Sequence, residues 1–239
     1  ETGPVVWVWM GDEQDANEDD IPELPVHNMD EWTHVVGKYN YLEGNYILMQ
    51  ENLCDLSHLP FLHADTFKFP KEYTSAPIKV ERDGDHVTFY REMEDWNLLK
   101  PFFHPGLDFG NQKVIYRSGG EYMTPATNKG YGLLYPVDEA GKEQAPVGHY
   151  VSHYVTPESE KSCHYFWYVA RNYALDDEDY SKKQGAMVQR GFEEDLVAIN
   201  LLQNMLENDQ HDYKEIGIKA DKPGVIMRKI IKGLVDRDR

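Results

Sequence analysis

The chain has 239 residues and carries 24 basic against 42 acidic side chains, a formal net charge of −18. That acidic balance argues against nucleic acids and anionic membranes as partners, and no apolar run approaches the roughly 20 residues of a membrane span. The length fits one large domain or at most two small ones. Cys54 and Cys163 form no C-x2-C pair, which argues against a zinc knuckle and favours a reducing, cytoplasmic compartment.

The pattern of the first 170 residues predicts strands. Alternating Val and Trp predict a buried strand over Val5–Met10, and Asp83-Gly84 lies between two short runs as a β-hairpin turn. Runs rich in Tyr, Val and Phe predict further strands over Ile78–Arg82, Val87–Arg91, Lys113–Arg117, Tyr131–Tyr135, Gly148–Val155 and Cys163–Val169, the last two joined by a loop over Thr156–Ser162.

Helical spacing begins after Leu175. Acidic and capping residues in 176–180 precede apolar residues at helical spacing over Ser181–Leu206, and Val225–Val235 predicts an amphipathic closing helix. Strands in the middle and helices near the end indicate an α+β fold, in which an antiparallel sheet packs against a long C-terminal helix.

The segment NLCDLSHLPFLH, residues 52–63, places polar side chains among leucines, where they cost free energy unless they have partners. Asp55 and His58 are three residues apart and would be neighbours on a helix. On an unbroken helix His63 would point about 140° away from His58. We expect Pro60 to break the helix and to bring the two imidazoles together.

Two imidazoles need a further ligand to hold a divalent metal. On the predicted long helix Asp195 borders the apolar stripe, whereas Glu193 and Glu194 lean towards solvent, so Asp195 is the best internal acid. Two His and one carboxylate form the facial triad of non-haem Fe(II) oxygenases, which leaves positions open for dioxygen and substrate. Asp55 would then accept a hydrogen bond from a ligand imidazole and fix its tautomer.

The segment NLCDLSHLPFLHAD resembles the iron-binding segment of the catalytic domain of Rieske non-haem iron oxygenases, whose pattern is N-x2-D-x2-H-x4-H. VWVWMGD, residues 6–12, is similar to the strand that joins the two domains of this family. TPESEKSCHYFW, residues 156–167, resembles the family's monooxygenase branch, and Glu194-Asp195 matches that branch's third ligand. The resemblance covers essentially the whole chain.

The resemblance implies a helix-grip (START-like) catalytic domain in which His58, His63 and Asp195 hold Fe(II). It implies that Asp55 bridges a ligand histidine to the [2Fe–2S] Rieske centre of a neighbouring subunit in a head-to-tail homotrimer. Asn52 would lie near the iron without binding it tightly.

A Rieske cluster needs two Cys and two His, which this family arranges as C-x-H and C-x2-H. The sequence has neither pair, so residues 1–239 are expected to be the catalytic domain alone, with the Rieske domain upstream. The resemblance implies electrons from NAD(P)H through a flavin or ferredoxin reductase. They would support O2-dependent hydroxylation or oxidative demethylation of an aromatic acid or aryl ether.

His164 corresponds to a substrate-contacting histidine of this branch, with a structural sheet histidine as the alternative. Strand alternation places it on one face with Phe166. His149 and His153 share a face of the preceding predicted strand, and we interpret both as structural or surface residues.

Three alternatives remain at this point. A phthalate-type, ring-dihydroxylating dioxygenase would share the ligand pattern. His63-Ala-Asp65 matches the HxD motif of 2-oxoglutarate-dependent oxygenases, with His164 and Arg171 as further candidates, although that motif belongs on a jelly-roll strand. A helix-grip fold also serves non-enzymatic ligand binding, since a fold does not dictate a function.

Overall fold

The computed structural model describes residues 4–9, 11–24, 30–94, 100, 103–208 and 215–237. In these residues an antiparallel sheet has the strand order β1-β8-β7-β6-β5-β4-β3, and β2 also pairs with β8. The strands are β1 Thr33–Val36, β2 Asn40–Leu42, β3 Lys79–Asp83, β4 His86–Met93, β5 Val114–Thr124, β6 Thr127–Pro136, β7 Val147–Ser159 and β8 Ser162–Arg171. The α-helices are α1 Tyr46–Cys54, α2 Leu59–Leu62, α3 Glu178–Asn208 and α4 Lys222–Arg237. The predicted α+β class, with an antiparallel sheet and a long helix, is confirmed.

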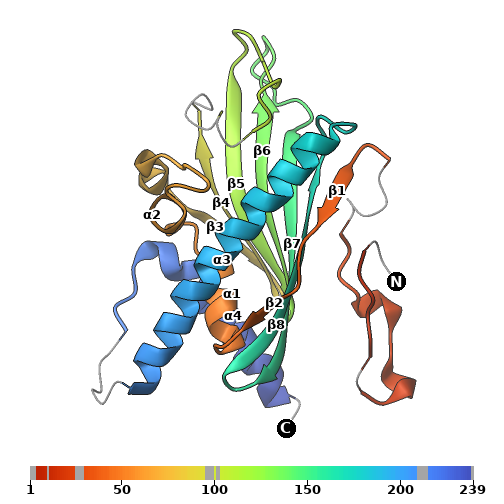
Figure 1. The fold of residues 1–239 in the computed structure, drawn as a ribbon, viewed down its shortest axis with the longest axis vertical. Helices are drawn as coiled ribbons and strands as arrows, with labels where there is room; N and C mark the ends of the chain where they lie inside the picture. The colour runs from red at the N-terminus through yellow and green to blue at the C-terminus, as the bar shows by residue number, and fades with distance from the viewer. Residues whose placement is uncertain are drawn as a thin grey trace.

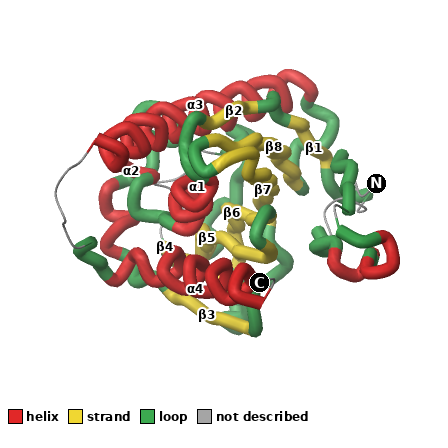
Figure 2. Tube along the Cα trace, turned by 90° about the horizontal axis from the view of Figure 1, so that it is seen from below, coloured by secondary structure: helices red, strands yellow, loops and turns green. Residues whose placement is uncertain are grey.

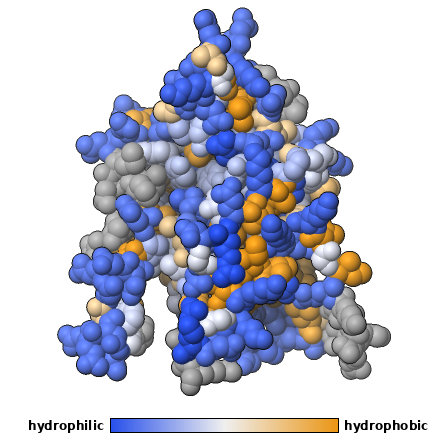
Figure 3. Space-filling model, turned by 180° about the vertical axis from the view of Figure 1, so that it is seen from behind, coloured by the Kyte–Doolittle hydropathy of each residue, from blue (hydrophilic) through white to orange (hydrophobic). Residues whose placement is uncertain are grey.

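The sheet curves around α1, while α3 and α4 lie on either side of that helix (Figure 2). α3 crosses the front of the sheet diagonally (Figure 1). Its apolar side chains pack on β8 through Tyr165, Trp167 and Val169, which form one buried cluster with Val188 and Phe192. Seen from behind, the surface is mainly hydrophilic, with an apolar strip near the middle (Figure 3). No helix in the described part of the chain is both long and apolar enough to cross a membrane.

The two predicted hairpins form, with different ends. Gly84 has a φ of 57°, the left-handed conformation that glycine adopts without a steric penalty, and β3 pairs with β4 around it. The loop predicted over residues 156–162 is wrong, because β7 and β8 stay paired out to Ser159 and Ser162. The sheet therefore extends further than the turn residues of that segment indicated.

The long helix starts slightly earlier than predicted. The carboxylate of Asp177 accepts a hydrogen bond from the backbone N–H of Tyr180 at 2.8 Å and caps the first turn. The buried stripe ends at Ile199, and Met205 is 51% exposed, because the last turns of α3 extend beyond the strands (Figure 1). Asp195 is only 3% exposed, as its position on the helix predicted.

The expected N-terminal strand is not observed in the described residues. Met10 lies outside them, and residues 5–9 carry only an isolated bridge at Val5. Trp7 packs against a small cluster around Tyr154 and Tyr168 on the outer side of the sheet, while Val8 is 71% exposed. The alternation of Val and Trp reflects this one-sided packing of a single segment.

Candidate metal centre

The two candidate histidines lie at the two ends of α2. α1 ends at Cys54, and the carboxylate of Asp55 then accepts hydrogen bonds from the backbone N–H and the hydroxyl of Ser57, at 2.7 and 2.6 Å. This side-chain turn reverses the chain, so that His58 precedes the four-residue helix and His63 follows it. The imidazole rings are 5.1 Å apart between centroids.

The expected role of Pro60 was therefore wrong, although the two rings do meet. Pro60 lies in the first turn of α2, where the absence of its N–H costs no intrahelical hydrogen bond. The helix breaks several residues earlier, at Asp55. The Asp55 side chain, which accepts hydrogen bonds from Ser57 two residues later, produces the turn, and the proline does not.

A glycine on α3 allows this segment to approach the long helix. A Cβ on Gly191 would lie 2.2 Å from the ring of Phe67, so only glycine leaves room for that ring. Gly191 is one turn before Asp195, and Phe67 is four residues after His63. The close contact between Gly191 and Phe67 therefore places His63 beside Asp195.

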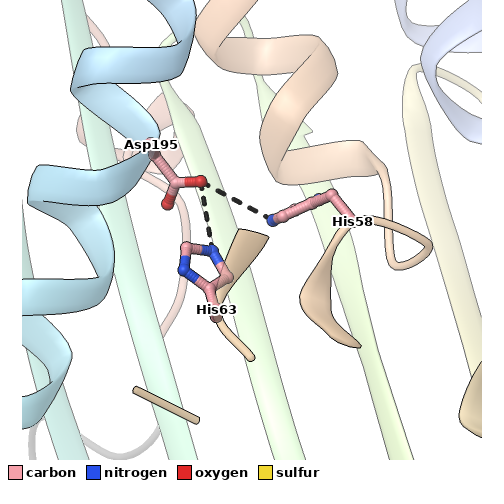
Figure 4. Close-up of side chains that lie close together, drawn as sticks. All are labelled: His58, His63 and Asp195. Carbon is pink, nitrogen blue, oxygen red and sulfur yellow. Dashed lines mark ion pairs between the residues drawn. The ribbon is translucent and has the colours of Figure 1, made fainter. Parts of the chain in front are cut away.

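The three predicted ligands converge in the structure (Figure 4). Oδ1 of Asp195 is 3.2 Å from Nε2 of His63 and 3.6 Å from Nε2 of His58. One ligand atom from each residue lies within 4.8 Å of the other two. Two histidines from the α2 turn and one acid from a helix more than 130 residues later thus present three donor atoms to one point.

A carboxylate sits behind each imidazole. Nδ1 of His63 is 2.8 Å from Oε2 of Glu194, and Glu194 also accepts a hydrogen bond from Thr66. Since a carboxylate only accepts, Nδ1 donates, and in the neutral imidazole Nε2 then keeps its lone pair towards Asp195. Asp55 lies 3.5 Å from Nδ1 of His58, on the side of the ring away from Asp195. Glu194 was expected to lean towards solvent and instead orients His63.

The side chains at this site have the chemistry that a metal ion requires. Oδ1 of Asp195 is buried without a hydrogen bond, and the Nε2 lone pair of His63 faces it. Two acceptors at this separation repel unless a cation lies between them. Burial disfavours the imidazolium form of His63, but the Asp195 and Glu194 carboxylates outweigh it and raise the pKa of His63. Two His and one carboxylate on one side match the facial triad that binds Fe(II).

A cavity of about 130 Å³ opens beside the three ligands. Asn52 lines it, and its amide nitrogen is buried without a hydrogen bond. His149 and His153 line it as well, which corrects their interpretation as structural or surface residues. Burial lowers the pKa of His149 to about 4 and, against the charge of Asp195, that of His153 to about 3. Both side chains are neutral hydrogen-bonding groups at neutral pH.

Glycines opposite these two histidines leave room for their rings. A Cβ on Gly132 would lie 2.9 Å from the His149 ring, and a Cβ on Gly130 would lie 3.2 Å from Nε2 of His153. Gly132 of β6 pairs directly with His149. Gly130 pairs with Val151, which lies between the two histidines. The sequence signal that was missed is this combination, in which two histidines four residues apart on β7 face two glycines two residues apart on β6.

His164 lies on the opposite face of the sheet, contrary to the expectation that it contacts substrate. Its neighbours Tyr165 and Trp167 point towards α3, and strand alternation therefore turns His164 away from the cavity. Nδ1 of His164 is 2.8 Å from the hydroxyl of Tyr39, in a half-exposed aromatic group with Phe166.

The HxD alternative finds no support in the geometry. His63 ends a helical turn and does not lie on a strand, and Asp65 is exposed. The acid beside His63 comes instead from α3.

Sequence comparison connects this geometry to a known family. Residues 42–237 match the family model of the vanillate O-demethylase oxygenase C-terminal domain. The toluene-4-sulfonate monooxygenase system iron-sulfur subunit TsaM1 of Comamonas testosteroni is 30% identical over 232 residues, which cover 92% of this chain and 64% of that protein. The vanillate O-demethylase oxygenase subunit of Pseudomonas sp. (strain ATCC 19151) is 30% identical over 250 residues, covering 98% and 72%.

Among solved structures, dicamba monooxygenase bound to 3,6-dichlorosalicylic acid superposes with a TM-score of 0.79 and 21% identity, covering 96% of this chain and 67% of that one. At this identity the likeness shows the fold. The chain spans less than two thirds of the length of the toluene-4-sulfonate protein.

Proposed function

Because the chain belongs to the vanillate O-demethylase oxygenase C-terminal domain family, we propose that it is the catalytic part of a Rieske-type non-haem iron monooxygenase. It would hydroxylate or oxidatively demethylate an aromatic substrate with O2. The observation that carries the proposal is the buried Oδ1 of Asp195, without a hydrogen bond and within 3.2 and 3.6 Å of two imidazole nitrogens.

His58, His63 and Asp195 would hold Fe(II), which supplies open coordination positions for O2 and one-electron chemistry. Glu194 keeps the proton of His63 on Nδ1, so that Nε2 is free to bind. Asp55 lies behind His58; desolvation opposes its ionisation, but the nearby His58 imidazole and the hydrogen bonds from Ser57 outweigh it and lower the pKa of Asp55. Glu194 and Asp55 would thus orient the two imidazole rings towards the iron.

The cavity supports a substrate with a single ring. A cavity of about 150 Å³ holds benzene, and the volume here is about 130 Å³. Its apolar walls include Phe67, Phe69 and Phe192, which suit an aromatic ring. The ring would lie between the iron ligands and the neutral imidazoles of β7.

Asp55 would be the point where electrons enter. Its side chain is 30% exposed, and it lines both the metal cavity and an outer cleft between α1, α3 and α4. We propose that a Rieske [2Fe–2S] centre, carried by a part of the enzyme outside residues 1–239, docks there from a neighbouring subunit of a homotrimer. A separate reductase would deliver electrons from NAD(P)H. Since Cys54 and Cys163 are free thiols, we propose a cytoplasmic location.

The test has two parts. First, anaerobic titration of this chain with Fe(II) should give one iron per chain. Second, the full-length oxygenase with its reductase should release formaldehyde from methoxylated aromatic compounds, and Asp55→Asn should keep the iron but lose turnover. Asp65→Asn is the matched control, because Asp65 is an exposed carboxylate of the same segment.

A chain that binds no iron would favour the non-enzymatic ligand-binding alternative. A cis-diol product would identify a ring-dihydroxylating dioxygenase instead. Wild-type turnover in Asp55→Asn would refute the electron-entry role while leaving the metal site intact.

A further inference from the structure

A buried guanidinium lies behind one end of the cavity. Arg171, in β8, is 0% exposed. Its hydrogen bonds go to neutral acceptors, which are the backbone carbonyls of Tyr173, Ala174 and Asp177, the hydroxyl of Ser181 and the side-chain carbonyl of Gln184. The Asp177 carboxylate also acts on this charge. No carboxylate is hydrogen-bonded to the guanidinium among the described residues, so part of its positive potential remains.

Gln184 carries this potential to the cavity wall. The side chain is 4% exposed and lines the metal cavity. Arg171 has only donors, so the atom it binds at 3.1 Å must be the amide oxygen of Gln184. The NH2 group of Gln184 is thereby left to donate, and among the described residues the structure gives it no protein partner. An amide whose oxygen is bound to a cation is a stronger donor.

Gln184 and the metal ligand Asp195 share one face of α3. They are eleven residues apart, which is three helical turns and an axial separation of about 16 Å. The cavity lies between these two side chains. A ligand that touches both ends must therefore carry its two polar groups on opposite sides of its ring.

An outer cleft meets the cavity at the same place. Gln184 and Met187 line both the cavity and a cleft of about 470 Å³, which Lys183, Asp177 and Asp179 also line. Asp179 is exposed and lies 3.9 Å from the ammonium of Lys182. The Asp177 carboxylate is engaged by His104 at 3.2 Å and by the first turn of α3. The acids that line the cavity, Asp55 and Asp195, are at its metal end.

We propose that Gln184, backed by Arg171, is the specificity-determining residue that binds a carboxylate of the substrate. The substrate class is then a single-ring aromatic acid with its carboxylate across the ring, in the para position, from the group that is oxidised. This inference rests on the proposed function and names the substrate class of the same site.

The test measures binding by calorimetry, independently of turnover, with iron content determined on each sample. The probes are 4-methoxybenzoate, 2-methoxybenzoate and methoxybenzene. We expect 4-methoxybenzoate to bind most tightly. Gln184→Leu should weaken it by about 10- to 100-fold, the effect of a hydrogen bond to a charged group, and should leave methoxybenzene within about twofold.

The matched control is Gln189→Leu. Gln189 is a buried amide on the same helix that bonds Asn40 and Trp167 and does not line the cavity, so its loss should not change the preference between probes. Gln184→Glu is the second variant, because it keeps the shape and places a carboxylate against Arg171. It should abolish the preference for the acid even if Gln184→Leu folds poorly.

Equal losses for the acid and for methoxybenzene would overturn the proposal, as would a wild-type chain that binds neither acid. Tighter binding of 2-methoxybenzoate than of 4-methoxybenzoate would overturn the para assignment. Iron binding with none of these preferences would leave the oxygenase proposal intact, whereas a chain without iron would refute that proposal separately.

Discussion

Two pairs of histidines line the same cavity and differ in what stands behind them. His58 and His63, on the turn around α2, each have a carboxylate near Nδ1 and share Asp195 on the other side. His149 and His153, on β7, face glycines of β6 instead. Nδ1 of His153 is 2.8 Å from the neutral hydroxyl of Tyr165.

The surroundings assign different chemistry to the same side chain. Carboxylates stabilise a positive charge on an imidazole, or on a metal bound to it, and they fix which nitrogen is free. Burial lowers the pKa of His149 and His153 and keeps both imidazoles neutral, which suits hydrogen bonding to a ligand. One pair should therefore bind metal and the other should contact substrate.

Iron binding should show the largest difference between the two pairs of histidines. His63→Gln is expected to reduce bound Fe(II) from one per chain to near zero, because it removes a ligand and leaves the buried Asp195 without its nearest imidazole. His149→Gln should retain full iron, because its ring is not among the converging ligands. Colorimetric iron determination after anaerobic loading measures both. Comparable iron loss in the two variants would mean that the pairs do not differ.

The glycines that make room for each pair provide a second test of the difference between the two pairs. Gly191→Ala would put a methyl 2.2 Å from Phe67, and Gly132→Ala would put one 2.9 Å from His149. Each is expected to destabilise the protein by about 1–3 kcal/mol through overpacking. Only Gly191→Ala should also weaken Fe(II) binding, since it separates the His63 segment from α3.

Urea unfolding and iron titration test this pair of variants together. Gly233→Ala is the control, because a methyl group added at this position on α4 would have no atom within 4 Å. It should stabilise the protein by about 0.5–1 kcal/mol through helix propensity. If Gly132→Ala weakened iron binding and Gly191→Ala left it unchanged, the proposed division of roles would be contradicted.

The sequence was sufficient to predict that the three candidate ligands meet, because their signal is local or periodic. His58 and His63 lie within one short segment, and the apolar stripe of α3 places Asp195 on its buried side. The turn at Asp55 depends on its carboxylate accepting from the backbone N–H of Ser57. Such a contact competes with helix formation, and spacing alone does not reveal it. The sequence therefore predicted the meeting of the imidazoles and misassigned its cause.

The second pair of histidines could not be assigned from spacing, because a strand has two faces and the sequence does not say which one is covered. Around His164 the sequence did not show whether the even-numbered or the odd-numbered side chains face the cavity. His153 pairs with Asn128 and Trp167, which places its side chain on the same face of the sheet as Trp167. That register depends on contacts across the sheet. Glu194 was missed for a related reason, since its partner Thr66 lies 128 residues away.

The pH dependence of stability should show the smallest difference and report the β7 pair directly. Burial lowers the pKa of His149 to about 4 in the folded chain, against 6.5 when unfolded. Between these values the unfolded chain binds a proton that the folded chain does not, so stability falls as the pH falls from 6.5 towards 4 and is fully present above 6.5. Each such group contributes about 1.4 kcal/mol per pH unit in that window.

His149→Gln should therefore make the pH dependence shallower by about 1.4 kcal/mol per pH unit, measured by urea unfolding of iron-free protein at pH 7, 6 and 5. Iron is removed because its own loss at low pH would add to the slope. His153 should keep part of the dependence in the variant, since burial also lowers its pKa. Parallel curves for wild type and variant would show that folding does not lower the pKa of His149, and its assignment as a neutral group would then be wrong.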